Sequence, residues 1–186
     1  KTPSRAPSGL VPEDDCVFGV FDQQEIRFGA TRLDDFKFED PKLDLAGKAA
    51  AGQFSSLEFY DYPGGYLEKS QAERYATLRL EELQCARRWI RMAASERGLM
   101  PGYKFSLEEH PADSLNGEYL VVRCTHHARL PESGEEDREG EATQRYTVDL
   151  EVIPATVPFR PARKTPRPVV RGSQTALVVG PKGEEI

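Results

Sequence analysis

The chain has 186 residues, of which 38% are hydrophobic and 30% are charged, and its formal net charge is −6 at pH 7. A chain of this length can bury a core as one medium domain or as two small ones. The acidic balance argues against nucleic-acid binding, which usually requires a basic face. No run of about 18 apolar residues occurs, so no stable membrane insertion is expected.

The N-terminal segment and the cysteines limit the class of protein further. Residues 1–14 begin with Lys1 and contain three prolines, which predicts a linker and a chain cut from a longer protein. Cys16, Cys85 and Cys124 are widely spaced, odd in number and set among apolar neighbours. A disulfide framework would favour an even number. We therefore expect three reduced, packed thiols in a protein that folds in a reducing cytosol.

The first half of the chain holds short candidate strands between polar segments. Residues 16–21 (CVFGVF) form an apolar run, and Gly19 within it indicates a bulge or a close approach. Residues 47–52 are rich in Ala and Gly without periodicity and are predicted to form a loop. Residues 56–62 (SLEFYDY) carry the aromatic side chains that suit a pleated sheet. We therefore expect strands at 16–21 and 56–62.

One helix is predicted at about residues 70–86. Ser70 and Glu73 have the spacing of a capping box, in which each side chain satisfies a free backbone amide of the first turn. Apolar residues then recur as a single helical stripe, formed by Ala72, Ala76, Leu80 and Leu83. The helix is therefore expected to pack through one face.

The turn Pro63-Gly64-Gly65 precedes this helix and allows two interpretations. Glycines before a helix can hold a phosphate, but such a loop needs a following Lys and Ser or Thr. Here Tyr66 and Leu67 follow instead. A corner between two elements is the favoured interpretation.

The second half predicts an antiparallel meander. Residues 103–109 alternate, with Tyr103, Phe105 and Leu107 on one face. Asn116-Gly117 is a strong hairpin signal, because both residue types accept positive φ. The return strand is expected at 118–128, and residues 145–153 alternate again.

Two further segments have unusual composition. Residues 131–142 are strongly acidic and lack large apolar side chains, so they are expected to form a disordered hairpin tip. Residues 158–174 are basic and rich in proline, which favours an extended spacer. The apolar run within residues 175–186 is expected to be the first strand of a further, truncated barrel.

The three histidines are candidate metal ligands. Adjacent strand residues point to opposite faces, so His126 and His127 cannot easily chelate one ion. His110 is expected near the hairpin turn, and no zinc-type ligand spacing is present. We expect His126 to pack on the face of Leu120, Val122 and Cys124.

Carboxylates at the end of the predicted 103–109 strand are candidate general acids and bases. They are Glu108, Glu109 and Asp113. Such groups at a strand end, with no element that forms a pocket around them, are usually solvated. No motif of a nucleophilic enzyme occurs in the sequence. We therefore predict no catalytic, cofactor-binding or metal-binding residue.

Several motifs resemble, in collinear order, those of VgrG, the spike protein of type VI secretion systems, and its phage tail hub relatives. They are SLEFYDYPGGYLEKSQAERYATLRLEELQ, LDDFKFEDPKLDL upstream of it, GLMPGYKFSLEEHP, LNGEYLVVRCTHHA, IPATVPFRPARKTPRP and GSQTALVVGPKGEEI. The resemblance covers residues 15–186. It implies that residues 87–94 are a strand, and that the helix packs on a barrel.

The resemblance implies a mainly β fold. This fold is an antiparallel meander or partial barrel of the phage tail hub type with one packed helix. The implied boundaries are a linker at 1–14, the second portion of the hub domain at 15–157, the spacer at 158–174 and the start of an oligosaccharide-binding-type barrel at 175–186.

The implied function is structural and non-enzymatic. VgrG-like proteins are homotrimers that cap the Hcp tube and help deliver effectors through target envelopes. They assemble in the bacterial cytoplasm and are then secreted, and an effector or spike-tip protein attaches through the C-terminal region.

Two alternatives remain from the sequence. One is a small metal-dependent hydrolase that uses His110, His126 or His127. The other is a cargo adaptor that uses residues 131–142 as its contact surface.

Overall fold

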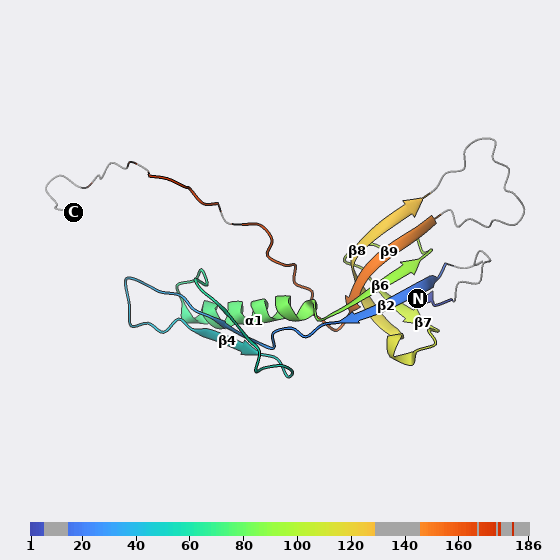
Figure 1. Cartoon of the computed structure of the whole chain (residues 1–186), viewed down its shortest axis with the longest axis horizontal. Helices are drawn as coiled ribbons and strands as arrows, with labels where there is room; N and C mark the ends of the chain where they lie inside the picture. Colours follow the sequence, from blue (N-terminus) through green and yellow to red (C-terminus); the bar gives the residue numbers. More distant parts are fainter. Residues whose placement is uncertain (6–14, 129–145, 167, 174, 176–179, 181–186) are drawn as a thin grey trace, which may run out of the picture.

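The computed structural model describes residues 1–5, 15–128, 146–166, 168–173, 175 and 180. These residues form two lobes, one around a six-stranded sheet and one around a three-stranded sheet with a helix (Figure 1). The elements in chain order are β1 (Thr2–Pro3), β2 (Val17–Gln24), β3 (Ala30–Leu33), β4 (Gly47–Ala50), β5 (Glu58–Asp61), α1 (Lys69–Cys85), β6 (Arg88–Ala94), β7 (Lys104–Glu108), the 3-10 helix η1 (Asp113–Leu115), β8 (Gly117–Ala128) and β9 (Tyr146–Pro154).

The larger sheet has the strand order β1-β7-β8-β9-β6-β2 and curls into a half-barrel. Strands β7, β8 and β9 form the expected antiparallel meander, and β6 then adds to β9 and β2 to β6. The two edges approach each other at the N-terminal segment. There Ser4 forms a bridge with Val17, and the Arg5 backbone N–H donates to the Val17 carbonyl at 2.8 Å. A few N-terminal residues therefore join the two edges of the sheet.

Alternating residues of these strands fill the interior of the half-barrel. In β9, Val148, Leu150 and Val152 are buried, as their period of two predicted. In β6, Ile90 and Met92 pack against them. The predicted strand at residues 87–94 is thereby confirmed.

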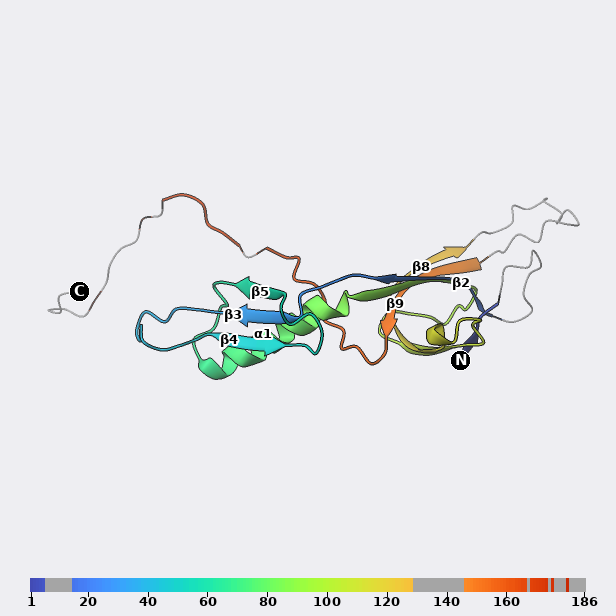
Figure 2. The same cartoon turned by 60° about the horizontal axis from the view of Figure 1, so that its bottom comes forward.

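The smaller sheet, with the order β4-β3-β5, has α1 on one face (Figure 2). The Thr31 hydroxyl donates to the Ala76 carbonyl at 2.8 Å, and both residues are buried. A Cβ placed on Gly47 would lie 2.3 Å from the carbonyl group of Ala72. The helix therefore approaches β4 so closely that no side chain fits at position 47.

This arrangement corrects three sequence predictions. The loop expected at 47–52 contains strand β4. Its small residues have a low strand propensity, but they allow the close contact with the helix. The helix packs on the separate small sheet and not on the barrel. Its N-cap is Glu68 without a side-chain hydrogen bond, so Ser70 and Glu73 do not form a capping box.

The predicted hairpin between β7 and β8 exists, but its turn differs from the expected two-residue type. Strand β7 ends at Glu108 and β8 begins at Gly117, so eight residues form the connection. Asn116 has a negative φ, and its side chain bridges the backbone N–H and carbonyl of His110 at 2.8 and 3.0 Å. Tyr103 lies outside the strand and is exposed. The asparagine therefore organises a longer loop through its amide group and not through positive φ.

The segment after β9 runs back along α1. Arg160 pairs with Glu81 at 2.7 Å, and the Arg163 guanidinium lies 3.3 Å from Asp61 and 3.5 Å from Glu82. The backbone N–H of Arg163 also donates to Glu82 at 2.9 Å. The first residues of the predicted 158–174 spacer are thus held on the helix by charge. Of the predicted strand at 175–186, only two residues are among those described.

Gly47→Ala should destabilise the protein, because the new methyl group must displace the backbone of α1. We expect a loss of about 1–3 kcal/mol in the free energy of unfolding, measured by chemical denaturation. Gly52→Ala is the matched control, since a Cβ there meets nothing within 4 Å. Equal stability of the two variants would contradict the close packing.

The hydrogen bond from the Arg163 backbone N–H to the Glu82 carboxylate should depend on pH. Burial raises the pKa of Glu82, but hydrogen bonds from Arg79 and the Arg163 backbone outweigh it, so the pKa lies below the usual range. A lowered folded pKa means that the contact is stable above the ordinary pKa of Glu, about 4.3, and is lost as the pH falls through the folded value.

The Arg163 amide resonance in an NMR titration reports this change. It should titrate with a midpoint below the ordinary pKa of Glu, and Glu82→Gln should abolish the transition. Glu58→Gln, on an exposed residue of β5, is the control and should leave the titration unchanged. An Arg163 amide that titrates identically in the Glu82 variant would refute the contact.

Candidate functional site

The turn Pro63-Gly64-Gly65 is closed by a carboxylate of the chain itself. The backbone N–H groups of Gly65 and Tyr66 donate to Oδ2 of Asp35 at 2.6 and 3.2 Å. Gly65 has a φ of 78°, which glycine adopts without strain. The amides that a phosphate would need are therefore already paired, which favours the corner interpretation.

Tyr66 connects this turn to the core of the small lobe. Its hydroxyl donates to the Leu45 carbonyl at 2.9 Å, and its ring packs edge-on against Tyr75 with centroids 5.8 Å apart. Burial, reinforced by the nearby Asp34 and Asp35, raises the pKa of Tyr66 to about 12. The turn thus fixes an aromatic side chain in the interior and has a structural role.

His126 and His127 point in different directions, as strand alternation predicted. The His127 ring lies 3.0 Å from Asp149, whereas His126 contacts Cys124 and Tyr146. A bulge in β8 between Val121 and Arg123 shifts the alternation. As a result Cys124 faces the core, and His126 does not share a face with Leu120 and Val122. His126 is also exposed, so its expected packing in the core is wrong.

The other candidate residues do not converge. Glu108 pairs with Lys1 at 2.8 Å, and Glu109 pairs with Arg5. Asp113 starts η1, and the His110 ring accepts a hydrogen bond from the Ala112 backbone within the same loop. Among the described residues, no three His, Cys, Asp or Glu side chains gather as a metal site would require. Over the same residues, no helix has the length and apolar character to cross a bilayer.

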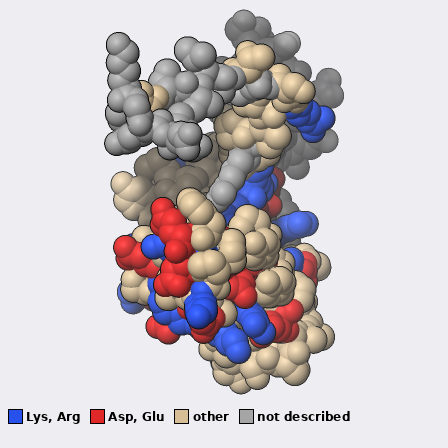
Figure 3. Space-filling view, turned by 90° about the vertical axis from the view of Figure 1, so that its left-hand side faces the viewer, with Lys and Arg blue, Asp and Glu red and all other residues tan. Residues whose placement is uncertain are grey.

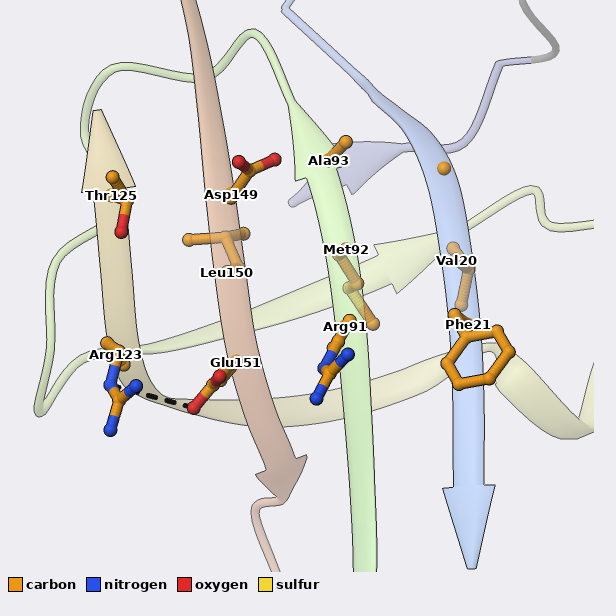
Figure 4. A pocket seen from close by; sticks show the side chains of 11 residues that line it. Val20, Phe21, Arg91, Met92, Ala93, Arg123, Thr125, Asp149, Leu150 and Glu151 are labelled. Carbon is orange, nitrogen blue, oxygen red and sulfur yellow. Dashed lines mark ion pairs between the residues drawn. The ribbon is translucent and has the colours of Figure 1, made fainter. Parts of the chain in front are cut away.

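A shallow groove crosses the outer face of the large sheet, over β8, β9, β6 and β2 (Figure 4). The small residues Gly19 and Ala93 are among those that line it. Charged side chains of both signs border it, and Arg123 pairs with Glu151 at 3.6 Å. No local sequence pattern predicts this groove, because its residues come from four strands. Such mixed charge on an open sheet face suits contact with a protein surface.

The small lobe exposes many large apolar side chains. Between residues 26 and 67 the exposed ones are Ile26, Phe28, Phe36, Phe38, Leu43, Phe54, Leu57, Tyr60, Tyr62 and Leu67. Phe38 is 79% exposed. Figure 3 shows that, at this end of the molecule, acidic and basic side chains are interspersed with uncharged ones. Their number makes the small lobe the candidate contact surface for another protein.

The comparison with known families agrees with this architecture. Residues 1–132 match the family described as phage tail baseplate hub (GPD). The chain belongs to this hub family. It is also 38% identical over 177 residues to the type VI secretion system spike protein VgrG1a of Pseudomonas aeruginosa, covering 94% of this chain and 27% of the relative.

Two further VgrG proteins show the same relationship. Identity is 37% to VgrG1b of Pseudomonas aeruginosa, over 88% of this chain and 22% of the relative. It is 33% to VgrG3 of Vibrio cholerae, over 84% of this chain and 16% of the relative. The hub chain therefore spans about a quarter or less of the length of these curated relatives.

A solved structure supports the hub fold independently of sequence. A tail protein from Neisseria meningitidis MC58 superposes with a TM-score of 0.57 at 8% identity, covering 84% of this chain and 44% of that one. At this identity the likeness concerns the fold alone. The predicted hub-type β fold is thereby confirmed.

Asp35→Ala should destabilise the hub chain, because it leaves the amides of Gly65 and Tyr66 without their acceptor. We expect a loss of about 1–3 kcal/mol in the free energy of unfolding, measured by thermal or chemical denaturation. Asp40→Ala, on an exposed residue of the same connection, is the matched control. A wild-type stability for Asp35→Ala would show that the carboxylate does not hold the turn.

Proposed function

We propose that this chain is a structural segment of the spike hub of a contractile injection machine of the type VI secretion kind. Its homology to VgrG spike proteins over most of its length supports this role. In this proposal the protein forms a homotrimer, caps the Hcp tube and helps deliver effectors across a target envelope. It assembles in the bacterial cytoplasm and then leaves the cell through the apparatus.

The exposed apolar surface of the small lobe is the observation that carries the proposal. A protein that worked alone would leave these side chains in water at a cost of roughly 25 cal/mol for each Å² that could be buried. In a ring of copies the same side chains would be covered by neighbouring subunits. The small lobe is held rigid by α1, so it can present this surface in one fixed shape.

The candidate residues of the chain support a non-enzymatic role. The carboxylates at the end of β7 are paired with the N-terminal segment. His110 is engaged by its own loop. These contacts give the candidate residues a structural role in the fold.

Light scattering of a chain extended to the length of its VgrG relatives tests the proposal. We expect a trimer that binds purified Hcp hexamers. Replacing Phe36 and Phe38 with Asp should reduce trimer formation at least about tenfold, since two buried aromatic rings contribute more than about 1.4 kcal/mol.

Tyr103→Asp is the matched control, because Tyr103 is also exposed but lies on the other lobe. It should leave the oligomeric state unchanged. An extended protein that remains a monomer and has no affinity for Hcp would contradict the proposed function.

A further inference from the structure

Cys124, His126 and Tyr146 form a cluster at one end of the half-barrel that the structural role does not use. The Cys124 Sγ lies 3.1 Å from Nε2 of His126, and Nδ1 of His126 is hydrogen-bonded to the Tyr146 hydroxyl. The two β8 residues are two positions apart, so they share a face of the strand. Tyr146 reaches them from the paired strand β9.

The three side chains are arranged as a nucleophile, Cys124, a base, His126, and a group that orients the base, Tyr146. Such sites place a base within about 2.6–3.2 Å of the nucleophile and orient that base through a third group. When the proton moves from Sγ to Nε2, both nitrogens of the imidazolium become donors. Nε2–H then faces the thiolate, and Nδ1–H faces the oxygen of Tyr146. Burial, followed by the charge of a Cys124 thiolate, raises the pKa of Tyr146, so the phenol stays neutral.

Among the described residues, three further charged groups act on the cluster. Arg97 lies over the Tyr146 ring at 5.5 Å, and Glu96 and Asp15 are also close enough to act on that tyrosine. Asp149 belongs to the opposite face, where it pairs with His127. His126 is therefore the group in contact with the thiol that can accept its proton.

The other two cysteines differ from Cys124 in access. Cys16 is completely buried, and Cys85 is 4% exposed with its thiol directed at the carbonyls of Glu82 and Arg160. Cys124 is only partly buried. Reagents in solution can thus reach Cys124 in the folded protein.

We propose that Cys124 is a reactive thiol and a site of covalent modification by low-molecular-weight disulfides and other soft electrophiles. His126 is its base, and Tyr146 is the positioning residue that orients the imidazole. With a disulfide, the thiolate attacks one sulfur and a mixed disulfide forms as the S–S bond breaks. The departing thiolate takes the proton from Nε2 of His126, so the disulfide itself is the only oxidant required.

Alkylation of the folded chain by iodoacetamide, followed by peptide mass spectrometry at a series of pH values, tests the proposal. Cys124 should be labelled well before Cys16 and Cys85. At neutral pH its rate should exceed that of the same thiol in the urea-unfolded chain by about tenfold, because an ordinary thiol is only a few per cent ionised there.

His126→Gln should remove this advantage and move the rise of the rate with pH to higher pH. Tyr146→Phe should produce a smaller change in the same direction. His127→Gln is the matched control, since its ring lies on the other face of β8, and it should react as the wild type. Protection of Cys16 in every variant verifies that the half-barrel is still folded, and protection of Cys85 verifies the same for the small lobe.

Glutathione disulfide provides the second readout. The wild-type chain should form a mixed disulfide at Cys124, and His126→Gln should form it about tenfold more slowly. Equal rates and equal pH profiles for the wild type and His126→Gln would overturn the proposal. Labelling of Cys16 or Cys85 ahead of Cys124 would overturn it as well.

Discussion

The close contact between α1 and strand β4 is the constraint on which the small lobe depends. Gly47 lies directly against the backbone of Ala72, and the buried Thr31 hydroxyl donates to the Ala76 carbonyl. A larger side chain at Gly47 or Ala72 would push the helix away from a sheet of only three strands. Because such a small sheet has little other core, this contact sets the shape of the surface that the lobe exposes.

The half-barrel is stabilised in a different way. Its long strands β8 and β9 pair along most of their length, and their alternating residues supply most of the core. The N-terminal segment joins the edges β1 and β2 at Ser4 and Val17, which covers an edge that would otherwise be open to pairing. The bulge in β8 then turns Cys124 and His126 toward Tyr146. A single extra residue thereby brings the thiol–imidazole pair to the face where it meets the Tyr146 hydroxyl.

Ion pairs connect the segment after β9 to the small lobe. Arg160 and Arg163 bring the segment after β9 back along α1, where Glu81, Glu82 and Asp61 face them. An exposed ion pair contributes little to the stability of a protein, but the side chain of Glu82 is largely shielded from solvent. In a spike hub, such a contact would aim the following part of the chain in a defined direction.

The sequence by itself determined the strong local elements. Strand β9 and helix α1 were predicted within a few residues, because period-two and period-3.6 patterns report which face is buried. The ordered motifs also indicated the hub family. Tertiary structure decided what local patterns cannot encode. It made a strand of residues 47–50, in which Gly47 lies directly against the backbone of the helix, and it placed that helix on the small sheet. It also replaced the Asn116-Gly117 turn by a side-chain bridge to His110. A bulge in β8 placed Cys124 and His126 on the core face beside Tyr146, because the position of a bulge depends on how β8 pairs with β9.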